Sequence, residues 1–229
     1  MSEISFDFAS IEDAEEIQFF IRQHWNKNHS YVYSKELLLK DYYWLTEPSK
    51  LSIAVVRDES KVLQGIFCFK FFNNLNLPDI AGALWKVTVE AEKKYQMIGV
   101  KLRNYVVNNV EHRFFSAPGP GPQTEVIYKM LRMQWHQMKQ FYAVNPTLAN
   151  YHLIKFKKPS NFLSSMQQTH KISIKKIIDK NELKLFEFNK HKNMLPFKDS
   201  NYIENRFFNY PYYMCYIFIA SIWFLNKSL

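Results

Sequence analysis

The chain has 229 residues, of which 47% are hydrophobic and 22% are charged, and its formal net charge is +9. This length and apolar content are enough to bury a core in one large or two modest domains. Two cysteines, Cys68 and Cys215, exclude a disulfide framework and a cysteine-based zinc site. Both lie in apolar stretches, where a cysteine is expected to act as a small buried hydrophobe.

The charge and the termini restrict the class of partner. A positive charge favours anionic partners, such as the phosphates of CoA, a nucleotide-linked sugar, nucleic acid or a membrane surface. The lysines of 155–192 are scattered and have no recognition helix or RNA-binding motif beside them, so no DNA-binding module is expected.

No signal peptide is evident at the N-terminus, so we assign the chain to the cytoplasm. The uncharged stretch 214–225 is shorter than the ~20 residues of a membrane-spanning helix.

Periodicity and turn residues predict alternating helices and strands. Alternation of apolar and polar residues indicates strands, and apolar residues at helical spacing indicate helices. In chain order we expect a strand at 5–10, helices at 11–25 and 35–44, a hairpin of 51–57 and 62–72 around the turn 58–60, a strand at 84–90, a helix after Gly99, a strand at 112–116, a turn at 118–122, a helix at 124–133 and a strand at 138–144.

The segment 84–102 is the most informative part of this order, because it runs from a strand through a short loop into a helix. Leu84, Val87 and Val89 predict the strand, and Leu102 begins the apolar face of the helix. Such a loop directs backbone N–H groups and the positive end of the helix dipole at a phosphate. Gly99 permits a close approach of the ligand.

This segment resembles the acyl-CoA-binding motif of the GNAT superfamily of N-acetyltransferases, Arg/Gln-x-x-Gly-x-Gly/Ala with an apolar residue three positions later. The Arg of the motif falls on Lys94, its last Gly on Gly99 and its apolar residue on Leu102. Met97 stands where the motif has its first Gly. The order of elements over residues 5–146 is also that of a GNAT domain. The resemblance therefore implies an α/β fold with a mixed central sheet flanked by helices.

The resemblance also implies a direct attack of a substrate amine on an acyl thioester, with acetyl-CoA or another acyl-CoA as co-substrate and no metal. It places Glu90 as the base, and Tyr128 as the acid for the leaving thiolate, because Tyr128 and Leu131 match the family's Tyr-x-x-Leu. The expected cofactor-binding residues are Val87, Thr88, Val89, Lys94, Tyr95, Gln96, Met97, Ile98, Gly99 and Val100.

An aromatic and imidazole cluster follows the first helix. The stretch from His24 and Trp25 to His29 is similar to the His-Trp-x-x-Asn-His of acyltransferases from bacterial surface-polysaccharide loci. These groups suit a sugar ring, to which they offer stacking and hydrogen bonds. We expect them to bind the acceptor, for which the resemblance favours an amino sugar or its nucleotide. Alternatively, Trp25 ends the amphipathic face of the helix and packs in the core.

An internal repeat accounts for the rest of the chain. Asp13 and Asp179 are 166 residues apart, and the same offset aligns Glu16 with Glu182 and Phe20 with Phe186. A repeat that is overlooked leads to a wrong fold assignment, so this offset bears on the domain organisation. We predict a GNAT-like domain at 1–146, a linker at 147–170 and an incomplete second GNAT-like unit at 171–229, as in tandem-GNAT acyltransferases.

Two other functions are compatible with these patterns. A Fem-type transferase that uses aminoacyl-tRNA belongs to the same superfamily, and the positive charge would permit binding of tRNA. A non-catalytic GNAT remnant is the other alternative, because Met97 and Arg132 replace glycines of the family motifs. Binding of acetyl-CoA and salt-dependent retention of tRNA would separate the three.

Overall fold

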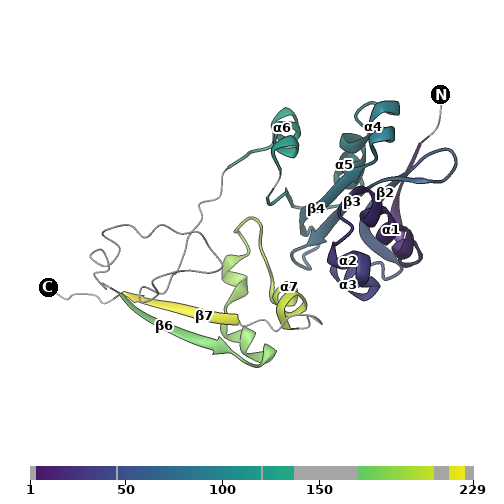
Figure 1. Ribbon diagram of the computed structural model, residues 1–229. Coiled ribbons are helices and arrows are strands. Elements are labelled where there is room, and N and C mark those ends of the chain that lie inside the picture. Colours follow the sequence, from purple (N-terminus) through teal and green to yellow (C-terminus); the bar gives the residue numbers. More distant parts are fainter. Residues whose placement is uncertain (1–3, 45, 120, 137–169, 209–216, 225–229) are drawn as a thin grey trace, which may run out of the picture.

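The computed structural model describes residues 4–44, 46–119, 121–136, 170–208 and 217–224. In this part of the chain, five strands form one sheet in the order β1-β2-β3-β4-β5 (Figure 1). Neighbouring strands are antiparallel, except that β4 and β5 are parallel. The strands are β1 (Ser5–Ser10), β2 (Lys50–Arg57), β3 (Leu63–Phe71), β4 (Asp79–Val87) and β5 (Phe114–Ser116).

Helices cover both faces of this sheet, which gives the α/β fold that the sequence predicts. One face carries α1 (Ala14–His24), α2 (Ser30–Tyr33) and α3 (Lys35–Asp41), and the other carries α4 (Val89–Lys94) and α5 (Ile98–Asn109). Successive side chains of a strand point to opposite faces. In β2, Ile53 and Val55 therefore pack under α1, whereas Ala54 and Val56 pack under α5. Because both faces are covered, β2 is an almost continuous apolar run.

Most expected elements lie where the sequence places them, with some differences. The helices α2 and α4 are not anticipated, and the strand expected at 84–90 runs instead from Asp79 to Val87. Thr88 ends it, because its Oγ1 accepts a hydrogen bond from the N–H of Ala91 at 3.1 Å and so caps α4. The helix α6 (Pro122–Met130) is close to the expected 124–133, whereas the strand expected at 138–144 lies outside the described residues.

The start of β4 carries a buried ion pair. The Asp79 side chain is fully buried and accepts two hydrogen bonds from Arg113, at 2.9 Å from Nε and 2.6 Å from Nη2. The N–H of Phe197 donates to the same carboxylate at 2.7 Å. Burial alone would raise the pKa of Asp79, but these hydrogen bonds outweigh it and hold the pKa below its usual range. The carboxylate of Asp79 thus connects β4 both to Arg113, which directly precedes β5, and to Phe197, which lies 118 residues further along the chain.

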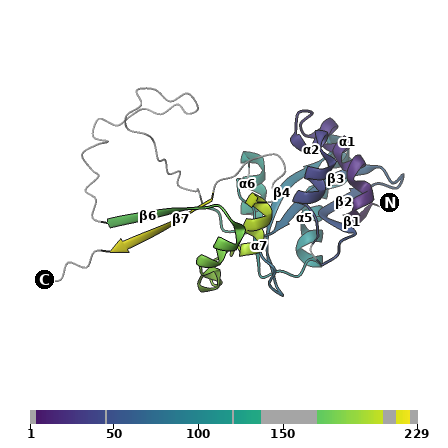
Figure 2. The same ribbon diagram turned by 90° about the horizontal axis from the view of Figure 1, so that it is seen from below.

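The C-terminal elements follow the same order as the first elements of the chain. They are β6 (His170–Ile177), η2 (Lys180–Leu185), η3 (Phe188–His191), α7 (Ser200–Ile203), the helical turn η4 (Glu204–Phe208) and β7 (Ile217–Phe224). β6 and β7 form a separate two-stranded sheet, away from the main sheet in both views (Figures 1 and 2).

The pairing of these two strands has the register of the first two strands of the main sheet. Phe6 lies opposite Val56, and Phe8 lies opposite Ala54. Adding the sequence offset of 166 to each number gives Ile172 opposite Ile222, and Ile174 opposite Ala220, which are the pairs observed between β6 and β7. The strand register is therefore compatible with the offset of 166 found in the sequence.

We expect Asp79→Asn to destabilise the fold, because it leaves Arg113 without its charge partner. Removing one member of a buried pair costs about 3–5 kcal/mol, and we expect the lower end since the Arg113 side chain is 30% exposed. Denaturant unfolding should measure this loss. Glu15→Gln is the control: its ion pair with Lys35 lies on the surface, so the midpoint should not change. An equal effect of both substitutions would contradict a special role of Asp79.

The pH dependence gives a second measurement of the same ion pair. Because the folded-state pKa of Asp79 is lowered, its stabilisation is complete above the ordinary aspartate pKa of about 4. It is lost as the pH falls through the folded-state pKa. The melting temperature of Asp79→Asn should therefore fall less steeply below pH 4 than that of the unmodified chain. Parallel curves would show that the carboxylate does not contribute.

Candidate functional site

The strands β4 and β5 separate soon after they meet. They pair only from Asp79 to Ala81, although β4 continues to Val87. Where they separate, β4 also contains a bulge: Phe67 lies opposite Trp85, but Phe69 lies opposite Gly82, so β4 has one extra residue. A bulge bends and twists its strand. In the described part of the chain, the second half of β4 thus has no strand beside it on the β5 side.

The helix α5 begins next to this open edge, and its N-terminus has no side-chain cap. By contrast, Ser34 and Thr88 cap α3 and α4. The first N–H groups of a helix have no partner within it, and here they belong to residues such as Gly99 and Val100. No acidic residue lies in the first turn. This N-terminus can therefore accept an anion.

Met97, which precedes this helix, has a left-handed backbone with φ of 58°. A residue with a Cβ is strained there, whereas glycine is not. This conformation gives a physical reason for the glycine that the GNAT motif has at this position. Gly99 has a different role, because a Cβ at Gly99 would lie 3.3 Å from Nε1 of Trp85. It allows the indole of Trp85 to pack against the first turn of α5.

A cavity of about 560 Å³ lies at this helix end, and we call it the α5 cavity. Its volume lies within the range of about 300–1,000 Å³ that small-molecule sites occupy. The residues that line it are His24, Trp25, Trp85, Lys86, Val87, Glu92, Met97, Ile98, Gly99, Val100, Thr124 and Ile127. They come from α1, β4, α4, the start of α5 and α6. The cavity thus brings together the end of the first helix and the loop of 84–102, which are far apart in the sequence.

Several residues expected in the site lie elsewhere. The ammonium of Lys94 pairs with Glu59 at 2.7 Å, and the hydroxyl of Tyr95 donates to the same carboxylate at 2.8 Å. Both side chains therefore hold the β2–β3 turn. Thr88 caps α4, as described above, and Val89 and Gln96 are exposed outside the cavity lining. Of the ten expected cofactor-binding residues, five line the cavity, namely Val87, Met97, Ile98, Gly99 and Val100.

The expected base, Glu90, is exposed in the first turn of α4 rather than at a strand end, and it does not line the cavity. Glu92 lines it instead. Residues two positions apart on a helix point in nearly opposite directions. The sequence interpretation assigned these residues to a strand, whereas α4 brings Glu92 rather than Glu90 to the cavity, and the role of Glu90 as base stays a prediction.

The histidine cluster separates into two parts. His24 and Trp25 line the α5 cavity, whereas His29 is the cap of α2: its Nδ1 accepts from the N–H of Tyr31 at 3.3 Å. Burial lowers the pKa of His29, which favours the neutral ring that such a cap requires. His29 thus has a local structural role, and its position in the motif did not reveal this.

Tyr128 lies beside the α5 cavity but not in its lining. Its side chain is 5% exposed, and its ring centroid is 5.8 Å from that of Trp85, which does line the cavity. Burial raises the pKa of Tyr128, and the nearby charge of Arg103 opposes this shift. The phenol is therefore neutral near pH 7 and able to donate a hydrogen bond.

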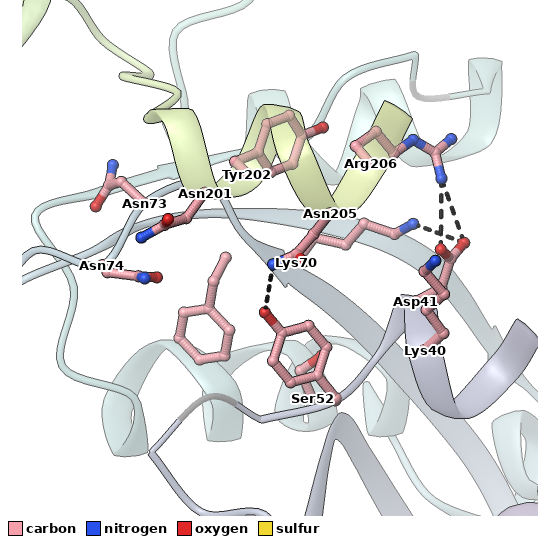
Figure 3. Close-up of a pocket in the computed structure, with 12 residues that line it drawn as sticks. Lys40, Asp41, Ser52, Lys70, Asn73, Asn74, Asn201, Tyr202, Asn205 and Arg206 are labelled. Carbon is pink, nitrogen blue, oxygen red and sulfur yellow. Dashed lines mark hydrogen bonds and ion pairs between the residues drawn. The ribbon is translucent and has the colours of Figure 1, made fainter. Parts of the chain in front are cut away.

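A second, polar pocket lies at the junction of the first sheet with α7 (Figure 3). The carboxylate of Asp41 accepts hydrogen bonds from Tyr31 at 2.5 Å and Lys70 at 3.0 Å, and it pairs with Arg206 at 3.4 Å. Lys40 and Arg206, which are 166 residues apart, both line it. This pocket holds only about 70 Å³, too little for a cofactor. It joins the two parts of the chain, and the α5 cavity remains the candidate site.

This chain is similar to known proteins in its fold but not detectably in its sequence. No protein-family model and no curated protein matches this sequence. Among solved structures, it is similar to the aminoglycoside N-acetyltransferase AAC(6')-Iy in complex with CoA, with 13% identity, a TM-score of 0.47, and coverage of 63% of this chain and 96% of the other. It is similar to a ribosomal-protein-alanine N-acetyltransferase from Brucella melitensis biovar Abortus 2308, with 11% identity, a TM-score of 0.44, and coverage of 62% and 100%.

A third similar structure bears a different name. It is a transcriptional regulator from Bacillus halodurans C-125, with 13% identity, a TM-score of 0.43, and coverage of 61% of this chain and 100% of the other. A fold alone does not establish a function, so the function is argued from the site.

The described residues contain no group of three or more His, Cys, Asp or Glu side chains arranged to hold a metal ion. In the same part of the chain, every helix is too short or too polar to cross a membrane.

We expect Met97→Gly to stabilise the protein, because it removes a left-handed backbone strain of about 1 kcal/mol. Met97 is 44% exposed, so little packing is lost. Val126→Gly is the matched control: Val126 is 65% exposed inside the helix α6, where glycine lowers the stability by up to about 1 kcal/mol. Denaturant unfolding should show opposite signs for the two variants. A loss of stability in Met97→Gly would contradict the strain argument.

Proposed function

We propose that the protein is an acyl-CoA-dependent N-acyltransferase of the GNAT type. One observation carries this proposal: the uncapped N-terminus of α5 opens into the α5 cavity beside Trp85 to Val87, the part of β4 that is not paired with β5. An anion-binding helix end beside an unpaired strand edge suits a ligand that has a diphosphate and a chain of amides, as CoA does.

In this proposal the N–H groups at the start of α5 bind the diphosphate, and Lys86 in the cavity adds a positive charge. The free edge of β4, near Val87, offers backbone groups to the pantetheine amides. Trp85, Met97 and Ile98 supply apolar walls. The co-substrate is thus acetyl-CoA or another acyl-CoA, held without a metal ion.

The reaction requires one bond to form and one to break. The lone pair of the acceptor amine attacks the thioester carbonyl, a C–N bond forms, and the C–S bond breaks. His24 and Glu92 are the groups in the cavity that can take the amine proton, directly or through water. We assign Tyr128, whose ring packs against that of Trp85, as the acid that protonates the leaving thiolate.

We infer that the acceptor is a small primary amine, with an amino sugar or its nucleotide preferred. His24 and Trp25 lie in the cavity, and Trp25 is 44% exposed, so an indole face and an imidazole are available to a sugar ring. The preference itself comes from the resemblance to acyltransferases of bacterial surface-polysaccharide loci. Use of aminoacyl-tRNA, as in Fem-type enzymes, and a non-catalytic role are the competing proposals, and we place all three in the cytoplasm.

We further infer that residues 171–229 are a second GNAT-like unit, joined by 147–170 to the first. The shared offset of 166 in sequence and strand pairing supports this inference, and so does the order of the elements. The described residues of the second unit include no equivalent of the loop before α5. It therefore provides support and acceptor-side surface rather than a second cofactor site.

The first test of this proposal is a titration with acetyl-CoA by calorimetry, which should give one CoA per chain. In Gly99→Val the new side chain meets Trp85 at the cavity wall and should abolish binding. Gly121→Val is the matched control, because a Cβ at Gly121 has no atom within 4 Å among the described residues. It should bind CoA as the unmodified chain does.

The outcomes separate the alternatives. Unchanged affinity in a folded Gly99→Val protein, or two CoA molecules per chain, would contradict the assigned cofactor site. No binding by the unmodified chain would favour the non-catalytic remnant. Retention of tRNA that weakens steeply with salt would favour the Fem-type alternative.

A second test concerns Tyr128. Tyr128→Phe keeps the ring that packs on Trp85 and removes only the hydroxyl. Because a positioned acid contributes about 10²- to 10⁴-fold, kcat should fall by at least about 10²-fold with little change in acetyl-CoA affinity. Tyr95→Phe is the control, since its hydroxyl contacts Glu59 outside the cavity. Equal turnover by Tyr128→Phe and the unmodified protein would show that the phenol is structural.

A further inference from the structure

Arg103, on α5, is a buried cation with few partners. Its residue is 9% exposed. Nη1 donates to Oδ1 of Asn104 at 2.9 Å, Nη2 lies 3.4 Å from the sulfur of Met133, and Nε has no hydrogen-bond partner among the described residues. No carboxylate in this part of the chain forms an ion pair with it. The ring of Phe115 lies 4.7 Å from its Cζ.

This environment satisfies the guanidinium poorly. A thioether is a weak hydrogen-bond acceptor. A cation–π interaction with an aromatic ring offsets only part of the desolvation free energy of a buried charge. The poorly satisfied groups, Nε and Nη2, lie on one edge of the guanidinium. That edge offers two parallel N–H groups, which is the geometry that binds two oxygens of a carboxylate or phosphate.

Three of the side chains around this arginine line a cavity, and Arg103 itself lies behind them rather than in the lining. Phe115, Tyr128 and Met133 form part of a space of about 590 Å³, which we call the aromatic cavity. Phe72, Trp135 and Leu195 line it further, so its walls are mainly aromatic and apolar. Lys198, which also lines it, places its ammonium 5.1 Å from the ring of Phe72 and adds a second positive charge.

We propose that the aromatic cavity binds a small organic anion, in which a carboxylate or phosphate group sits on an aromatic or apolar body. The anionic group pairs with the Nε and Nη2 edge of Arg103 in place of the sulfur of Met133. The body of the ligand fills the space between the aromatic walls. This site is distinct from the α5 cavity, from which the rings of Trp85 and Tyr128 separate it.

The test compares anions with neutral molecules of the same shape on the full-length protein. Benzoate and phenyl phosphate are the anionic probes, and benzamide and benzyl alcohol are their neutral counterparts. Because a hydrogen bond to a charged group contributes about 1.5–3 kcal/mol, calorimetry should show the anions binding at least about tenfold more tightly. A comparison of the affinities of benzoate and phenyl phosphate shows whether the site prefers a carboxylate or a phosphate.

Arg103→Met should abolish this preference, and Arg22→Met, an exposed arginine of α1, should preserve it. Without ligand, Arg103→Met should melt at the same temperature as the unmodified chain or higher, because it removes an unpaired buried charge. Arg103→Lys keeps the charge but lacks the two-donor edge, so it should also lose most of the preference.

Two results would overturn the proposal: equal binding of benzoate, phenyl phosphate and their neutral counterparts, or an anion preference that survives in both Arg103 variants. A marked fall in the melting temperature of Arg103→Met would show that Arg103 is structural. Acetyl-CoA titrated onto the benzoate-saturated protein should bind as before. Failure of CoA to bind even without benzoate would count against the proposed function alone, whereas loss of CoA binding only in the presence of benzoate would overturn the assignment of benzoate to a separate site.

Discussion

The buried ion pair of Asp79 and Arg113 holds together the parts of the chain on which the rest of the structure depends, namely β4, the start of β5 and the C-terminal segment. It lies where β4 and β5 meet, and only three residues of each strand are paired, from Asp79 to Ala81 in β4. Since the carboxylate also accepts from the N–H of Phe197, and Arg113 Nη1 donates to the carbonyl of Lys192 at 2.7 Å, the C-terminal segment is held at the same point. Beyond this point β4 continues without β5 beside it, and its unpaired residues Trp85, Lys86 and Val87 line the α5 cavity.

The sequence predicted the central sheet well because its strands are recognisable locally. β2 and β3 alternate between two buried faces and flank a polar turn, so their bounds differ from the expected ones by one residue at most. The start of β4 could not be predicted in the same way. Asp79 is unfavourable in an isolated strand, and its partner Arg113 is 34 residues away. Only the folded chain shows how this charge is satisfied.

The site was predicted in part, for a similar reason. The motif placed Met97 to Val100 correctly at the start of a helix, but the β-branched run Val87-Thr88-Val89 suggested a strand where Thr88 caps α4. The competing signal was present, since a Thr before acidic residues is typical of a helix start. Glu92 and Arg103 gave no sequence signal at all. Their roles depend on which side of a helix faces a cavity.

The two cavities share a wall, and this arrangement connects the proposals physically. Trp85 contacts Gly99 at the start of α5 and stacks near Tyr128, which in turn lines the aromatic cavity close to Arg103. A buried positive charge beside a phenol favours its ionised form and so makes it a better proton donor. An anion bound to Arg103 would reduce this effect. The charge state of the aromatic cavity therefore acts on Tyr128, the residue that we assign to protonation of the leaving thiolate.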